Sequence, residues 1–108
     1  MPDNEELTPA EAKQHLAKGA LLLDVRENDE WTRGHVQGAQ HIPLGELQAR
    51  SGELPTNREI VCMCRSGRRS AKAQSILATV PSVGPVYNLN GGILRWVKDA
   101  LPITGTTE

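Results

Sequence analysis

Aromatic residues are scarce in this sequence, which contains two Trp, one Tyr and no Phe. The hydrophobic core must therefore be built mainly from Leu, Ile, Val and Ala. Long apolar runs are also absent, and none approaches the roughly 20 residues that cross a membrane as a helix. We expect residues 1–108 to form one small domain, and no membrane partner is implied.

An excess of positive charge is missing as well, because 12 Lys and Arg residues face 13 Asp and Glu residues. The formal net charge of −1 gives no reason to expect a nucleic acid as partner. The first six residues are acidic and lack the basic and apolar parts of a secretory signal. We therefore expect a cytoplasmic protein.

Cysteine is limited to Cys62 and Cys64. Side chains two residues apart in a strand point to the same face, with Cα atoms about 6.6 Å apart, at the upper edge of disulfide geometry. We expect no structural disulfide, and reduced thiols suit the cytosol. Cys62 is interpreted as a small core hydrophobe, with a resolving thiol as the alternative.

Short apolar runs alternate with segments that have the pattern of helices. Helices are predicted at residues 9–18, 27–33, 44–50, 70–78 and 93–100, and strands at residues 20–23, 41–42, 60–63 and 86–89. This alternation indicates an α/β fold with a mainly parallel sheet and helices on both faces. The core is expected to span about residues 5–103, and residues 104–108 are expected to be a loose tail.

The segment from Cys64 to Ser70 follows a predicted strand and leads into a predicted helix. Cys64, like Asp24 and Asn90, then lies at the carboxyl end of a strand, where open parallel sheets bind ligands. Loop amides and a helix N-terminus favour an anion at this point. Because such surroundings lower the pKa of a thiol, Cys64 is predicted to be a nucleophile beside an anion site.

Four segments together resemble the rhodanese-like family of sulfurtransferases. They are LDVR at residues 23–26, GHVQGAQHIP at 34–43, CRSGRRS at 64–70 and NGGILRW at 90–96. The resemblance covers about residues 5–103 and implies a three-layer sandwich with a mainly parallel five-stranded sheet. One departure is the segment 81–85, where two prolines stand in place of the family's usual Gly–aromatic turn.

The resemblance also implies the chemistry of Cys64. As a thiolate, Cys64 would take the outer sulfur of a small anionic donor such as thiosulfate and hold it as a persulfide. A thiol, cyanide or a partner protein would then accept the sulfur, so that one difficult step is split into two. No metal and no organic cofactor is required by this chemistry.

The remaining residues of the loop are candidates for binding the substrate. They are Arg65, Ser66, Gly67, Arg68, Arg69 and Ser70. Backbone N–H groups from Arg65 to Arg69 can surround the sulfur, and the arginine side chains can orient an oxyanion. Gly67 permits the loop to curl, and Ser70 can cap the following helix or bond inward. Which arginine reaches the substrate is left open.

Asp24 and Arg26 are expected to support the site as a charge pair that braces the neighbouring loops. Among rival functions, a cysteine phosphatase needs a loop one residue longer with Arg where this chain has Ser70. A non-enzymatic binding module is disfavoured by the intact Cys64, and a thiol redox pair by the spacing of the cysteines. The physiological sulfur donor and acceptor are left open.

Overall fold

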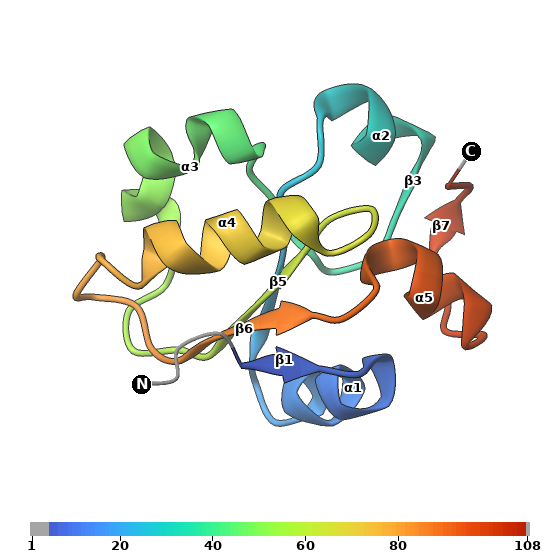
Figure 1. Ribbon diagram of the computed structural model, residues 1–108, viewed down its shortest axis with the longest axis horizontal. Helices are drawn as coiled ribbons and strands as arrows, with labels where there is room; N and C mark the ends of the chain where they lie inside the picture. Colours follow the sequence, from blue (N-terminus) through green and yellow to red (C-terminus); the bar gives the residue numbers. More distant parts are fainter. Residues whose placement is uncertain (1–4, 108) are drawn as a thin grey trace.

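The computed structural model describes residues 5–107, which fold around a five-stranded parallel sheet (Figure 1). Its strands are β1 (Glu6–Leu7), β2 (Leu21–Asp24), β4 (Gln40–His41), β5 (Ile60–Met63) and β6 (Val86–Leu89). Their order across the sheet is β1-β6-β5-β2-β4, and every neighbouring pair is parallel. This confirms the predicted sheet and places β5, which leads to Cys64, in its centre.

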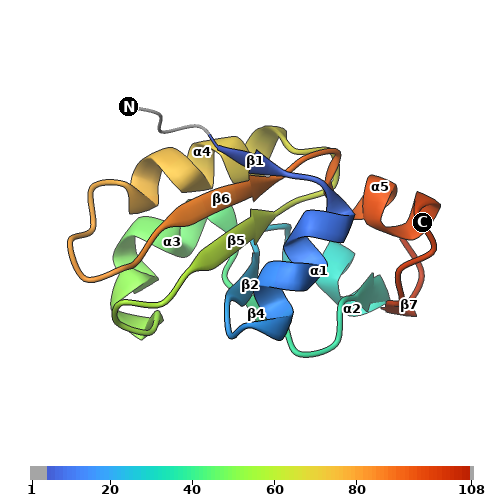
Figure 2. The same ribbon diagram turned by 90° about the horizontal axis from the view of Figure 1, so that it is seen from below.

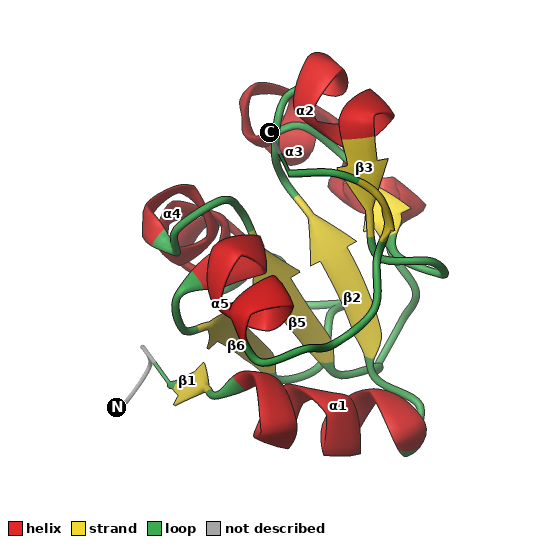
Figure 3. Cartoon of the chain, turned by 90° about the vertical axis from the view of Figure 1, so that its right-hand side faces the viewer, coloured by secondary structure: helices red, strands yellow, loops and turns green. Residues whose placement is uncertain are grey.

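Helices cover both faces of the sheet, as predicted (Figures 1 and 2). They are α1 (Pro9–Ala17), α2 (Asn28–Arg33), α3 (Leu44–Arg50), α4 (Arg68–Leu77) and α5 (Gly92–Lys98), with a short 3₁₀ turn at Ser51–Glu53. The helices α3 and α4 lie on one face, and α1 lies on the opposite face (Figure 3). Within residues 5–107, no helix combines the length and the apolar character needed to cross a membrane.

The two central strands, β2 and β5, are buried along their whole length. Alternate residues face opposite sides, as the pleat of a strand requires. Leu23 and Cys62 pack in the cluster that lies against α3 and α4. Leu22 and Val61 pack with Trp96 in the cluster that lies against α1 and α5. The core is therefore largely aliphatic, as the shortage of aromatic residues indicated.

Three short strands were not predicted. The first, β1, pairs with β6 at one edge of the sheet. The other two, β3 (Gly34–His35) and β7 (Thr104–Gly105), form a separate antiparallel pair. The expectation of a loose tail is therefore wrong for Thr104 and Gly105, because the Thr104 hydroxyl also donates to the His35 carbonyl at 3.1 Å. Residue 108 of that expected tail lies outside the described residues.

Candidate active site

Cys64 directly follows β5 and lies at the carboxyl edge of the sheet, as predicted. The chain then turns through Gly67, whose φ of 110° lies in the left-handed region, and α4 begins at the next residue. The Gly67 N–H donates a hydrogen bond to the Cys64 Sγ at 3.0 Å. The loop thus curls around the sulfur and leaves Cys64 only 1% exposed.

Opposing effects set the pKa of Cys64. Burial raises the pKa because desolvation disfavours the thiolate. The Ser70 hydroxyl and the backbone N–H groups of Ser70, Gly67 and Ser66 lower it by donating hydrogen bonds to the sulfur. Together the hydrogen bonds outweigh the burial, and the pKa lies below that of an ordinary thiol. The direction of this shift is the one expected for a nucleophilic thiol.

Ser70 does not cap α4, because Gly67 occupies the N-cap position. Ser70 lies instead in the first turn of α4, fully buried, with its hydroxyl 3.4 Å from the Cys64 Sγ. The same hydroxyl lies 2.5 Å from the Oδ1 atom of Asn88 in β6. The alternative that Ser70 bonds inward is therefore the correct one.

The three arginines of the loop have different environments. Arg69 forms a bidentate ion pair with Glu30 of α2, at 2.7 and 2.9 Å. The hydrogen bonds from Arg69 are the largest cause of the low pKa of Glu30, which falls to about 2. Arg65 and Arg68 are exposed, and neither pairs with a carboxylate of residues 5–107. The side chains available to attract an anion are therefore those of Arg65 and Arg68.

Asp24 and Arg26 form a buried charge pair at the carboxyl end of β2, and they are 0% and 2% exposed. The guanidinium donates to both carboxylate oxygens of Asp24 at 2.8 to 3.1 Å. It also donates to the Gly34 carbonyl at 2.8 Å. The pair thus joins β2 to β3, and the guanidinium of Arg26 is directed at these partners and not at solvent.

The N-terminus of α5 packs against the loop that follows Cys64 and binds its backbone. The N–H groups of Ile93 and Leu94 donate to the carbonyls of Cys64 and Arg65 at 2.8 and 3.2 Å. A Cβ atom on Gly92 would lie 2.6 Å from the Cys64 carbonyl oxygen, so only glycine permits this approach. Gly92 of the fourth motif is therefore required for the close packing of α5 against the loop.

Two residues of the site were not recognised from the sequence. Glu30 lies 39 residues from Arg69, and no local pattern connects them. Asn88 did leave a signal, because it is a polar residue within the short apolar strand β6 and is only 2% exposed. A buried amide must find hydrogen-bonding partners, and those of Asn88 are Ser70 and the Gly67 carbonyl at the loop and Glu6 in β1.

Cys62 differs sharply from Cys64. Complete burial, with a smaller contribution from the charge of Cys64, raises the pKa of Cys62 to about 12. Cys62 therefore remains a neutral thiol and packs in the core beside Leu23. Among residues 5–107, no cluster of three His, Cys, Asp or Glu side chains could hold a metal ion.

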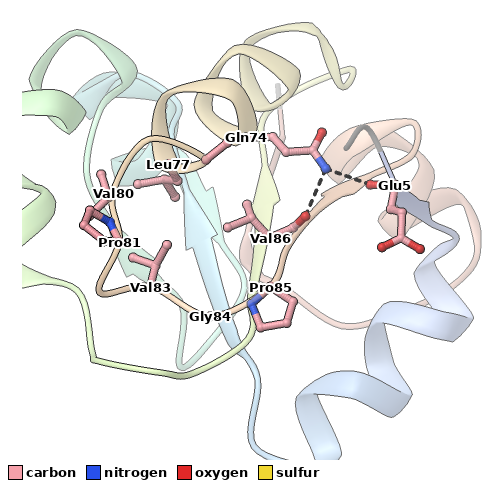
Figure 4. Close-up of a pocket in the computed structure, with 10 residues that line it drawn as sticks. Glu5, Gln74, Leu77, Val80, Pro81, Val83, Gly84, Pro85 and Val86 are labelled. Atoms are coloured by element: carbon pink, nitrogen blue, oxygen red, sulfur yellow. Dashed lines mark hydrogen bonds between the residues drawn. The ribbon is translucent and has the colours of Figure 1, made fainter. Parts of the chain in front are cut away.

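A separate cavity of about 400 Å³ lies at the C-terminal end of α4 (Figure 4). Cys64 lies before the N-terminal end of the same helix. Leu77, Val83 and Val86 line it, and Gln74 donates to the carbonyls of Glu5 and Val86 at 3.0 Å each. The two prolines of residues 81–85 lie at its rim. The departure from the family's usual turn therefore lies at this end of the molecule and not at the loop around Cys64.

The model of the Rhodanese-like domain matches residues 8–99, which is most of the chain. The chain belongs to the rhodanese-like domain family. It is 36% identical to a sulfurtransferase of Allochromatium vinosum, in an alignment that covers 91% of this chain and 92% of that protein. It is also 34% identical to thiosulfate sulfurtransferase 18 of Arabidopsis thaliana, covering 92% of this chain and 82% of that protein.

Some relatives are longer than this chain. The putative sulfur carrier protein YrkF of Bacillus subtilis is 40% identical, but the alignment covers 81% of this chain and only 43% of YrkF. Among solved structures, a rhodanese-related protein of Thermoplasma volcanium matches with a TM-score of 0.84 and 26% identity. That match covers 93% of this chain and 97% of the other. The predicted rhodanese-like fold is therefore confirmed, in a family that includes sulfurtransferases.

Proposed function

We propose that this protein is a sulfurtransferase in which Cys64 carries the transferred sulfur as a persulfide. The observation that carries the proposal is the geometry at the Cys64 Sγ, which accepts the Gly67 N–H at 3.0 Å inside the curled loop. Hydrogen bonds of this kind lower the pKa of Cys64 and would stabilise an anionic terminal sulfur in the same place. The relatives named sulfurtransferases support the same conclusion.

In the first step, the Cys64 thiolate attacks the outer sulfur of a donor such as thiosulfate. A sulfur–sulfur bond forms at Cys64 while the sulfur–sulfur bond of thiosulfate breaks, and sulfite leaves with the bonding electron pair. Arg65 and Arg68 are exposed and have no carboxylate partner among the described residues, so they are available to attract the dianion. Arg69, which is paired with Glu30, holds the loop in place.

In the second step, the thiolate of an acceptor attacks the terminal sulfur of the persulfide. The acceptor becomes a persulfide, and Cys64 leaves as the thiolate with which the cycle began. Cyanide would accept the same sulfur and leave as thiocyanate. A partner protein with a thiol could also be the acceptor, and the sulfur carrier named among the relatives is consistent with such a relay.

The geometry favours sulfur over a phosphoryl group as the transferred unit. Cys64 is only 1% exposed, so the opening above the sulfur is narrow. Six positions after Cys64, where a phosphatase needs an arginine, the chain has the buried Ser70 directed at Cys64 and Asn88. We therefore expect thiosulfate to react and para-nitrophenyl phosphate to remain unhydrolysed.

Intact-protein mass spectrometry after incubation with thiosulfate tests the proposal. We expect a gain of one sulfur atom on the native protein and on Cys62→Ala, and none on Cys64→Ala. Cyanide should remove the sulfur and release thiocyanate in equal amount. If the native protein gains no sulfur from thiosulfate but does from a persulfide such as that of glutathione, the donor assignment is wrong and Cys64 remains the carrier. If neither donor loads Cys64, the proposed function is wrong.

A further inference from the structure

Asn88 is a buried side chain whose orientation is fixed by its neighbours. Its Nδ2 atom lies 3.1 Å from the Gly67 carbonyl oxygen and 3.4 Å from a carboxylate oxygen of Glu6. Both of these neighbours only accept hydrogen bonds, so the NH₂ group of the amide must face them. The Oδ1 atom of Asn88 is thereby turned toward Ser70.

The Ser70 hydroxyl has one hydrogen and two acceptors competing for it. The Asn88 Oδ1 atom lies 2.5 Å away, and the Cys64 Sγ lies 3.4 Å away on the other side. When the hydrogen points to Asn88, Ser70 presents only lone pairs to Cys64, which suits a thiol or the uncharged inner sulfur of a persulfide. When it points to Cys64, it forms a charge-assisted hydrogen bond to the thiolate.

We propose that Asn88 is a positioning residue that draws the Ser70 hydrogen away from Cys64 and releases it when the Cys64 thiolate forms. The hydroxyl then occupies two positions during a catalytic cycle. It donates to Cys64 in the free thiolate and returns to Asn88 when the sulfur is a thiol or carries a persulfide. The inference rests on the proposed role of Cys64 as nucleophile, but its test requires no sulfur donor.

Arg65 and Arg68 of the loop are exposed and have no carboxylate partner among residues 5–107, whereas the charged groups on the neighbouring elements are paired. On the α4 side, Arg69 is paired with Glu30 of α2. On the β2 side, Asp24 is paired with Arg26. In β1, Glu6 accepts hydrogen bonds from the side-chain amides of Asn88 and Asn90 at 3.4 and 2.6 Å. In β5, Cys62 stays neutral because its pKa is about 12. The Ser70 hydrogen is therefore the group near Cys64 whose direction Asn88 controls.

The experiment is the rate of alkylation of Cys64 by iodoacetamide as a function of pH, followed by peptide mass spectrometry. Asn88→Leu removes the competing acceptor, so we expect alkylation at about pH 6 to be roughly threefold faster, with the midpoint of the pH profile shifted to lower pH. Ser70→Ala should shift the midpoint to higher pH. In the Ser70→Ala background, Asn88→Leu should have no further effect, because the hydrogen on which Asn88 acts is gone.

The matched control is Asn90→Leu. Asn90 also bonds Glu6 but does not contact Ser70, and the replacement should leave the pH profile unchanged. If Asn88→Leu does not fold, Asn88→Asp serves as the second variant, because it keeps an acceptor toward Ser70. Asn88→Asp should shift the midpoint of the pH profile to higher pH. This shift should be smaller in the Ser70→Ala background. The proposal is overturned if Asn88→Leu slows alkylation, or if either Asn88 variant has an equal effect with and without the Ser70 hydroxyl.

Discussion

Cys62 and Cys64 are two residues apart and pack in the same cluster, yet the structure gives them opposite chemistry. Burial raises the pKa of Cys62 to about 12, because no donor compensates for its desolvation. Cys64 is almost as buried, but the hydroxyl of Ser70 and the amides of the loop lower its pKa below the ordinary value. Reactivity is thus decided by hydrogen-bond donors and not by exposure alone.

Selective alkylation follows from this difference. In the native protein at pH 7, we expect iodoacetamide to modify Cys64 at least about a hundredfold faster than Cys62, since only the thiolate reacts. Peptide mass spectrometry at successive times measures both rates. In denaturant the two thiols should react at similar rates, which serves as the control. Comparable labelling of both in the native protein would show that Cys62 is not held in the core.

At the level of residues, the sequence singled out Cys64 and its loop as the candidate site because glycine, arginine and serine lie beside it in the chain. It could not assign Glu30 or Asn88, whose partners lie 39 and 18 residues away. It also could not distinguish the paired Arg69 from the exposed Arg65 and Arg68. These distinctions depend on which segments the folded chain brings together, and no local pattern records them.

Among the elements, α5 depends on Gly92 to reach the active loop. A Cβ atom at this position would overlap the Arg65 carbonyl, and its φ of 62° is unfavourable for other residues. We expect Gly92→Ala to lower the free energy of unfolding by about 2 kcal/mol or more and to abolish loading of Cys64. Urea unfolding and mass spectrometry after thiosulfate treatment would measure the two effects.

Gly45→Ala is the matched control for this prediction. Gly45 lies in α3, and a Cβ atom there would meet no atom within 4 Å. Because alanine favours a helix, this replacement should stabilise the protein by up to about 1 kcal/mol and leave loading unchanged. A Gly92→Ala variant as stable and active as Gly45→Ala would contradict this prediction. It would show that α5 can shift away from the loop without lowering stability or activity.

The ion pair between Glu30 and Arg69 joins α2 to α4, and its contribution should depend on pH. The pKa of Glu30 is lowered from 4.5 to about 2, so the stabilisation is present above about pH 4.5 and is lost as the pH falls through 2. Both side chains are partly exposed, so we expect Glu30→Gln to cost only about 1 kcal/mol at pH 7. Urea unfolding at several pH values should show the cost shrinking below pH 4.5.

Glu46→Gln provides the comparison for this ion pair. Glu46 pairs with Arg50 within α3, where both side chains are well exposed, and its removal should cost little at any pH. If Glu30→Gln costs no more than Glu46→Gln at pH 7, the contact between α2 and α4 does not stabilise the fold. A cost that stays constant down to pH 2 would show that the charge of Glu30 is not its source.

The elements with apolar patterns of four or more residues were predicted well. The strands Ile60–Met63 and Val86–Leu89 and the helix Leu44–Arg50 have the predicted bounds. The two-residue strands β1, β3 and β7 were missed, because two residues show no periodicity and their pairing is set by a distant partner. The start of α4 at Arg68, two residues before the predicted start, reflects the turn at Gly67.

At the scale of the whole molecule, the strand order brings the site together. Because β5 lies between β6 and β2, Cys64 has Asn88 on one side and Asp24 on the other. The rule that parallel sheets bind ligands at their carboxyl edge predicted a site here, and the structure places Cys64 and Asp24 at that edge. The same central position removes Cys62 from water, and this couples one thiol to the stability of the entire fold.

That coupling predicts how stability changes in alkaline solution. The native protein keeps the Cys62 proton up to about pH 12, whereas the unfolded chain releases it near the ordinary pKa of 9.0. Between these values the native state binds more protons than the unfolded state, so the free energy of unfolding falls as the pH rises. The contribution of Cys62 to this decline should approach about 1.4 kcal/mol per pH unit.

Urea unfolding of the native protein and of Cys62→Ala between about pH 8 and pH 10.5 isolates this contribution. Cys62→Ala should be less stable at pH 8, because the replacement leaves a small cavity in the core. Its stability should fall less steeply with pH, so the difference between the two proteins narrows as the pH rises. All other titrating groups are common to both proteins and cancel in the difference. Parallel pH profiles would mean that Cys62 ionises in the folded protein as readily as in the unfolded chain, contrary to its burial between β2 and β6.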